Sequence, residues 1–235
     1  MKPTSCVRRA ERLFGAGIGV AAAVYGAYAG ITWYRYGHAA APSPDEQDPL
    51  LDRFMPAYEV AERHRIRVAA PAALTLAAAK DVQLQGSGLV RIIIRARELI
   101  LGANPGDRPR PRGLLAEVQA LGWGVLADVP DRELVAGAVT RPWEANVTFR
   151  ALPPDQFAAF NEPGYVKIAW TLRADAISAT ESIFRTETRV MATDPDARSK
   201  FRRYWSFLSP GIIAIRWAVL GPLKREAERR AVQGG

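Results

Sequence analysis

The chain has 235 residues, of which 49% are hydrophobic and 24% are charged, with one cysteine and two histidines. This composition is typical of one globular domain with some additional sequence, and it excludes a disordered or fibrous chain. A single cysteine excludes an internal disulfide, and His38 and His64 form no cluster with metal-ligand spacing. We therefore expect no structural metal, and no pattern in the sequence requires a cofactor.

The formal net charge of +8 is unevenly distributed. Residues 1–41 contribute +4 and residues 194–235 contribute +5, whereas residues 42–193 carry a net charge of −1. Nucleic-acid-binding domains concentrate basic side chains on one face or along one element. Because the basic excess lies at the two ends of this chain, we expect no nucleic-acid partner.

The N-terminal segment has the length of a membrane span, with 21 uncharged residues from Leu13 to Trp33. At about 1.5 Å per residue, a helix of this length crosses the roughly 30 Å hydrocarbon core. Four basic residues precede the segment and only Arg35 follows before the acidic stretch, which predicts a cytoplasmic N-terminus and an extracytoplasmic body. A cleaved signal peptide is the alternative, since residues 39–41 are small, but its apolar core is normally about 7–15 residues. We favour a single-pass transmembrane helix within residues 1–41.

Residues 42–56 are rich in turn formers and are interpreted as a linker. Polar and apolar side chains then alternate over residues 58–68, which predicts a strand with one buried face. Helical spacing predicts two helices, over residues 71–84 and 89–101. The proline- and arginine-rich stretch 104–113 is predicted to be a loop.

The period of two returns after this loop and predicts a mostly antiparallel sheet. Its predicted elements are strands from residue 123 to 129, 133–140, 146–150, 165–174 and 180–192, with a short helix over 153–160. In the last strand, Phe184, Thr186, Thr188 and Val190 share one face, and Arg185, Glu187 and Arg189 share the other.

A long helix is predicted to begin at Asp194-Pro195, because an aspartate caps free amides and proline suits the first helical turn. Pro210 and Pro222 should kink or break it. Apolar residues recur in this segment at steps of three and four, and form the stripe Phe201, Tyr204, Trp205, Leu208, Ile212, Ile215, Val219 and Leu223. The basic residues, Arg216 among them, fall mostly outside the stripe and are expected to form a solvated or lipid-facing surface.

This order of elements resembles the START-like helix-grip superfamily, often labelled SRPBCC or polyketide-cyclase-like, over residues 57–231. The most similar stretch runs from Thr186 through Asp194-Pro195 to Pro210-Gly211, and residues 68–84 and 153–160 are also similar. The resemblance implies an α+β fold in which a curved antiparallel sheet surrounds a long C-terminal helix and leaves a cavity between them. Such proteins typically bind lipids, sterols, polyketides or quinones, and only some are enzymes. The single transmembrane helix before the domain is a departure from most of them.

Glu62 and His64 are the strongest candidates for polar residues in such a cavity, because their two-residue spacing places both on the apolar face of one strand. An acid beside an imidazole is capable of proton transfer. The alternative is a polar pair that bonds to itself or to water. Four aromatic residues are candidates for the cavity wall or for ordinary core, namely Trp123, Trp170, Phe184 and Trp205.

Three hypotheses for the function follow. The first is a membrane-tethered module that binds or transfers a hydrophobic small molecule such as a lipid, a quinone or a polyketide-like compound. The second is a cyclase- or dehydratase-like enzyme that uses acid and base groups in the cavity, and the third is a structural or interaction domain with a filled centre. Because the sequence contains neither a nucleophile motif nor a phosphate-binding loop, we assign no catalytic residue and expect binding or transfer rather than turnover.

Overall fold

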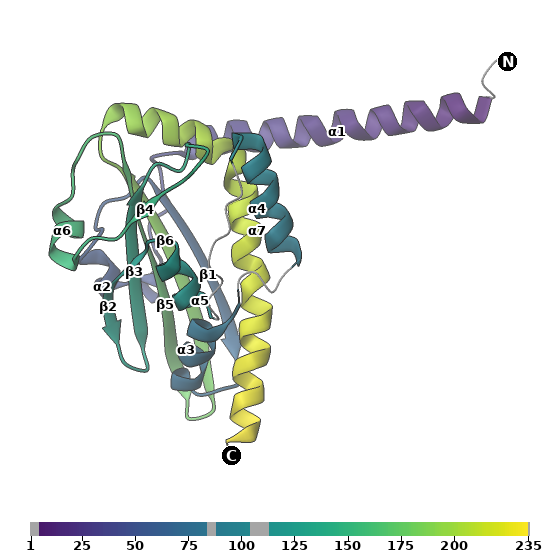
Figure 1. The fold of residues 1–235 in the computed structure, drawn as a ribbon. Helices are drawn as coiled ribbons and strands as arrows, with labels where there is room; N and C mark the ends of the chain where they lie inside the picture. The colour runs from purple at the N-terminus through teal and green to yellow at the C-terminus, as the bar shows by residue number, and fades with distance from the viewer. Residues whose placement is uncertain (1–4, 84–87, 104–112, 235) are drawn as a thin grey trace.

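In a computed structural model, residues 5–83, 88–103 and 113–234 are described, with side chains from Gly17 onward except Ile18. The chain forms an α+β fold with a six-stranded antiparallel sheet and a long C-terminal helix (Figure 1). The strands follow the order β1-β6-β5-β3-β2, and β4 pairs with β3. Their bounds are β1 Val60–Val68, β2 Gly124–Val129, β3 Glu133–Thr140, β4 Phe149–Arg150, β5 Val166–Ser178 and β6 Glu181–Ala192.

The predicted strands and their antiparallel pairing are confirmed. The helices are α1 Ser5–Arg35, η1 Pro44–Glu46, α2 Pro49–Asp52, α3 Ala72–Asp81, α4 Gly88–Leu101, α5 Leu114–Ala120, α6 Pro154–Ala159 and α7 Pro195–Gln233. Most of the predicted loop at 104–113 lies outside the described residues.

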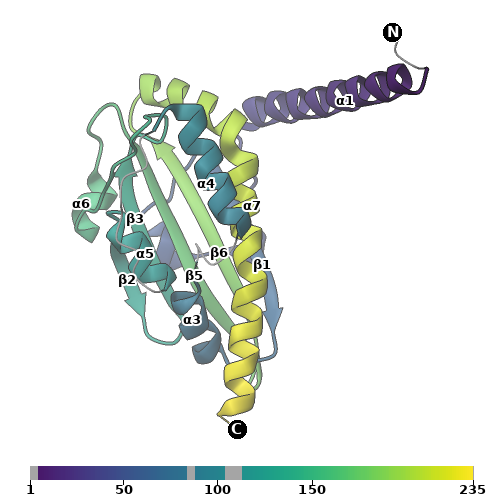
Figure 2. The same ribbon diagram turned by 45° about the vertical axis from the view of Figure 1, so that its right-hand side comes forward.

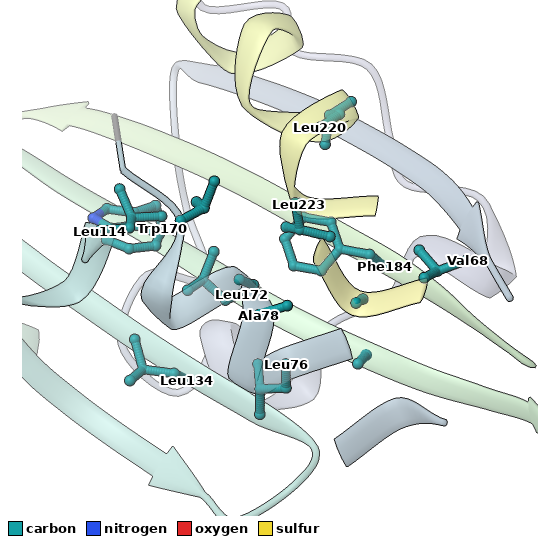
Figure 3. Close-up of a cluster of buried hydrophobic side chains, with 14 of the residues drawn as sticks. Val68, Leu76, Ala78, Leu114, Leu134, Trp170, Leu172, Phe184, Leu220 and Leu223 are labelled. Carbon is teal, nitrogen blue, oxygen red and sulfur yellow. The ribbon is translucent and has the colours of Figure 1, made fainter. Parts of the chain in front are cut away.

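Helices cover one face of the sheet, where α3, α4, α5 and α7 lie together (Figure 2). The main core forms beneath them, and Figure 3 shows side chains of the sheet, such as Trp170 and Phe184, together with Leu114 and Leu223 from the helices. Burial of a large apolar side chain contributes about 1.5–3 kcal/mol. This cluster therefore holds α7 and α3 to the sheet.

The opposite face of the sheet is also covered, although its strands carry charged residues there. Leu51, Phe54 and Met55, from the segment interpreted as a linker, pack with α6 against that face. Arg189 is 1% exposed and donates hydrogen bonds to Glu187, to Asp52 and to the Met55 carbonyl. Both faces of β6 are therefore buried, the charged face as well as the apolar one.

The long helix α7 begins as predicted, because the Asp194 carboxylate accepts hydrogen bonds from the amides of Asp196 and Ala197. Pro210 and Pro222 both lie inside it. Figure 1 shows a sharp turn in the first half of α7. The helix nevertheless continues to Gln233, so the prolines do not end it.

The helix with the length and composition of a membrane span is not the one that the sequence pattern indicated. Among the described residues, one helix is long and apolar enough to cross a membrane, and it is α7. Only 22% of its most apolar stretch is buried. Within the described residues, the long apolar helix is therefore C-terminal and not the predicted N-terminal one.

We predict that Trp205→Ala lowers the free energy of unfolding by roughly 3–5 kcal/mol, as is usual for a buried tryptophan. Trp205 is 7% exposed and stacks on Phe201 with 5.9 Å between ring centroids. Chemical unfolding of the full chain in mild detergent would measure the change. Phe207→Ala is the matched control, since Phe207 lies on the same helix but is 50% exposed and should cost much less. Equal effects of the two substitutions would contradict this packing.

Candidate ligand cavity

A cavity with two lobes lies between the sheet and α7. The C-terminal lobe, of about 180 Å³, is lined by Trp170, Leu172, Phe184 and Leu223, among others. The N-terminal lobe, of about 200 Å³, lies next to Phe201 and Trp205. Trp123, Ile212 and Arg216 line both lobes. The two lobes are therefore neighbours, with these three residues between them.

The walls are mainly apolar because alternate residues of the strands face α7. Aromatic rings lie close together there. The ring centroid of Trp123 is 5.1 Å from that of Phe149 and 6.2 Å from that of Trp170. From α7, Ile212, Ile215 and Val219 reach the cavity. Such a surface favours an apolar ligand, since each Å² of apolar area removed from water contributes about 25 cal/mol.

Polar groups enter the N-terminal lobe from β1 and β6. Glu62 pairs with Thr188 and His64 pairs with Thr186 in the antiparallel register, so the four side chains share one face. Glu62 and Thr188 line the N-terminal lobe. The Thr188 side chain oxygen is buried and has no hydrogen-bond partner among the described residues.

Burial raises the pKa of Glu62, while the charges of Arg216 and Arg63 lower it. Burial lowers the pKa of Arg216 to about 10, and the Glu62 carboxylate opposes that shift. Arg216 therefore remains charged at neutral pH. Within the described part of the chain, Arg216 and Glu62 form no ion pair or hydrogen bond, so they interact only through space.

His64 lies close to the cavity but does not line either lobe. It lines a separate polar pocket of about 190 Å³ with Thr186, Trp217 and Arg63. Its ring is 5.0 Å from that of Trp217, and both ring nitrogens lack a hydrogen-bond partner among the described residues. Burial, and then the charge of Arg216, lower the pKa of His64. The imidazole is therefore neutral at pH 7.

The structure thus separates the two residues that the sequence placed together. Glu62 reaches the N-terminal lobe and His64 reaches the polar pocket, because Trp217 of α7 covers the imidazole. The four aromatic candidates do line the cavity: Trp123 lines both lobes, Trp170 and Phe184 line the C-terminal lobe, and Trp205 lines the N-terminal lobe.

Arg216 is the residue that sequence reasoning missed, because it was assigned to the solvated basic surface of the last helix. The available signal was a single charge within the otherwise uncharged stretch from residue 204 to 223. In the structure this arginine faces the cavity. No group of three or more possible metal ligands occurs within the described residues.

No known protein family matches the sequence, and no curated protein matches it. Three chains of solved structures do match. One is the Zhui aromatase/cyclase from Streptomyces sp. R1128, with 14% sequence identity and a TM-score of 0.23, covering 73% of this chain and 94% of that chain. At this identity and TM-score the likeness carries no conclusion about ligand or reaction, so the inferences below rest on the residues of this chain.

We predict that His64 titrates with a pKa below 6.5, the ordinary value for histidine. Arg216→Gln should raise this pKa without restoring it fully, because burial remains. Nuclear magnetic resonance of ¹⁵N-histidine-labelled full-length protein would measure the titration. With only two histidines in the chain, His38→Gln assigns the signals. An unchanged His64 pKa in Arg216→Gln would contradict the position of the guanidinium.

Proposed function

We propose that this chain is a membrane-tethered module that binds or transfers a hydrophobic small molecule in the cavity between the sheet and α7. The observation that carries the proposal is the two-lobed apolar cavity with one charged helix residue, Arg216, at its centre. A domain with a purely structural role would gain stability by filling this space with side chains, since uncovered apolar walls forgo packing energy.

The enzyme hypothesis is weaker. A mechanism in which Glu62 and His64 act together as acid and base needs both within hydrogen-bond reach of one substrate. Glu62 is the carboxyl group in the cavity wall, and the neutral imidazole of His64 faces the other pocket. This separation favours binding without turnover.

We further infer that α1, rather than the apolar helix α7, crosses the membrane with the N-terminus in the cytoplasm, because α7 is packed against α3 and β1. Figure 1 shows α1 leaving the body near the turn of α7 and projecting away from all other elements. Apolar side chains on its described part are exposed, including Val20, Val24 and Ile31. Tyr25 and Tyr28 bind the Phe207 carbonyl and the Ser209 hydroxyl, so the base of α1 is attached to α7.

A second apolar surface supports the tether. Helix α4 buries Val90 but exposes Leu89, Ile92, Leu99 and Ile100 on another face. Figure 1 shows α4 on the side of the body from which α1 projects. A helix with an exposed apolar stripe and nearby arginines is suited to lie at a bilayer surface. The membrane would therefore lie beside the helices that close the cavity, where an apolar ligand is most concentrated.

To test the cavity, we predict that a diazirine-bearing hexadecanol photolabels residues of the two lobes in the full chain. Val219→Trp should reduce this labelling several-fold, because the larger ring occupies the C-terminal lobe. Val232→Trp is the matched control, since Val232 lies on the same helix and is 84% exposed. Mass spectrometry of tryptic peptides would locate the label. Equal labelling of both variants, or labelling confined to α1, would refute the ligand site.

To test the tether, we predict opposite membrane sides for the two ends of the chain. A membrane-impermeant maleimide should label Cys6, the single cysteine, only from the cytoplasmic side. In a Cys6→Ser background, Val232→Cys should be labelled only from the other side. Labelling of both positions from the same side would exclude α1 as a span, and release of the protein by alkaline carbonate would exclude an anchor altogether.

A further inference from the structure

We propose that the ligand is an amphiphile with a single carboxylate, whose head group binds Arg216 in the N-terminal lobe and whose apolar body extends into the C-terminal lobe. This inference rests on the proposed function, and it adds the chemical class of the ligand.

The first support is the position of Arg216. Its side chain reaches the junction of the lobes from α7, where the surrounding walls are mostly isoleucine, leucine and aromatic side chains. A guanidinium offers five hydrogen-bond donors, and none of them has an acceptor within the described residues. The Arg216 side chain is partly exposed and stands in a mainly apolar wall. A guanidinium in this position is suited to bind an anion.

The second support is the arrangement of the acceptors and donors around it. The Thr188 side chain is 7% exposed and its oxygen is unpartnered among the described residues. Thr188 lies opposite Glu62 in the β1–β6 register, and both line the lobe that Arg216 enters. A hydroxyl and a guanidinium can donate to the two oxygens of one carboxylate. Arginine binds carboxylates with two parallel hydrogen bonds, which a neutral alcohol cannot accept in the same way.

Glu62 determines how much negative charge the site accepts. A dianionic head group would meet one guanidinium and a neighbouring carboxyl group, so a second negative charge would be unpaired. A monoanion can be accommodated when Glu62 is protonated, because the protonated carboxyl then donates a hydrogen bond instead of repelling the ligand. Burial favours this protonated form and raises the pKa of Glu62. The site therefore suits a carboxylate better than a phosphate monoester.

The polar and apolar parts of the cavity set the orientation of the ligand. Glu62 and Thr188 line the N-terminal lobe, whereas the C-terminal lobe adds Leu114, Leu220 and Leu223. The head group therefore lies near β1 and β6, and the apolar body passes Arg216 toward the C-terminal end of α7.

The test is competition against the neutral diazirine-bearing hexadecanol, using the full chain in nanodiscs of phosphatidylcholine. The competitors are chain-matched pairs, decanoic acid with decanol and hexadecanoic acid with hexadecanol, together with decyl phosphate. In the parent protein at least one of the acids should compete about tenfold better than its alcohol, as expected when one charged hydrogen-bonded pair is added. Decyl phosphate should compete less well than decanoic acid.

Variants test which residues produce the preference for acid over alcohol. Arg216→Gln should abolish the preference for acid while the neutral probe still labels the cavity, and Arg216→Lys should retain part of it. Thr188→Val should weaken it by a smaller factor. Arg203→Gln is the matched control, since Arg203 is an exposed arginine of the same helix. Thermal unfolding of each variant shows whether it folds, and the acid–alcohol comparison in the parent protein needs no variant.

Equal competition by acid and alcohol in the parent protein would overturn the inference while leaving the proposed function intact. A preference for acid that survives in Arg216→Gln, or stronger competition by decyl phosphate than by decanoic acid, would also overturn it. Failure of the neutral probe to label either lobe would instead refute the proposed function itself.

Discussion

Helix α7 crosses one face of the sheet and supplies side chains to two of the three buried clusters, from Phe201 and Trp205 at one end to Leu223 and Ala227 at the other. Between these two clusters, Ile212, Arg216 and Val219 of the same helix line the cavity. The helix therefore supplies both core side chains and one wall of the cavity.

Two arginines, one on each side of the sheet, differ in the hydrogen bonds that their guanidinium groups make. Arg189 is surrounded by Glu187, Asp52 and a backbone carbonyl, and Tyr58 lies 4.6 Å from its guanidinium. Its bonds attach the segment before β1 to the outer face of the sheet, a role that an apolar residue would not perform with the same geometry. Arg216 has no such set of partners within the described residues. Arg189 is thus buried and bonded, whereas Arg216 is partly exposed and lines the cavity.

The elements proposed to face the membrane are attached to the helix that closes the cavity. The base of α1 is bonded to α7 near its turn, through Tyr25, Tyr28 and the pair of Arg202 with Trp33. The helix that closes the cavity is thus attached directly to the proposed anchor. Helix α4 packs beside α7.

The sequence by itself determined the strands, the mostly antiparallel character of the sheet and the start of the last helix, because these depend largely on local rules. Alternation defines a strand face, and Asp194-Pro195 caps a helix whatever surrounds it. The aromatic candidates for the cavity wall were also predictable, since residues of one parity in neighbouring strands share one face.

Only the tertiary structure decided the rest, because burial depends on what packs against a face. Local spacing assigned Arg216 to a solvated surface, whereas in the structure it lines the cavity. The same spacing joined Glu62 and His64, whereas Trp217 from a distant part of the chain separates them. The charged face of β6 had the pattern of a solvated surface until residues 43–58 covered it. In the last two cases the deciding contacts join residues more than a hundred positions apart, and no periodicity in a single segment contains that information.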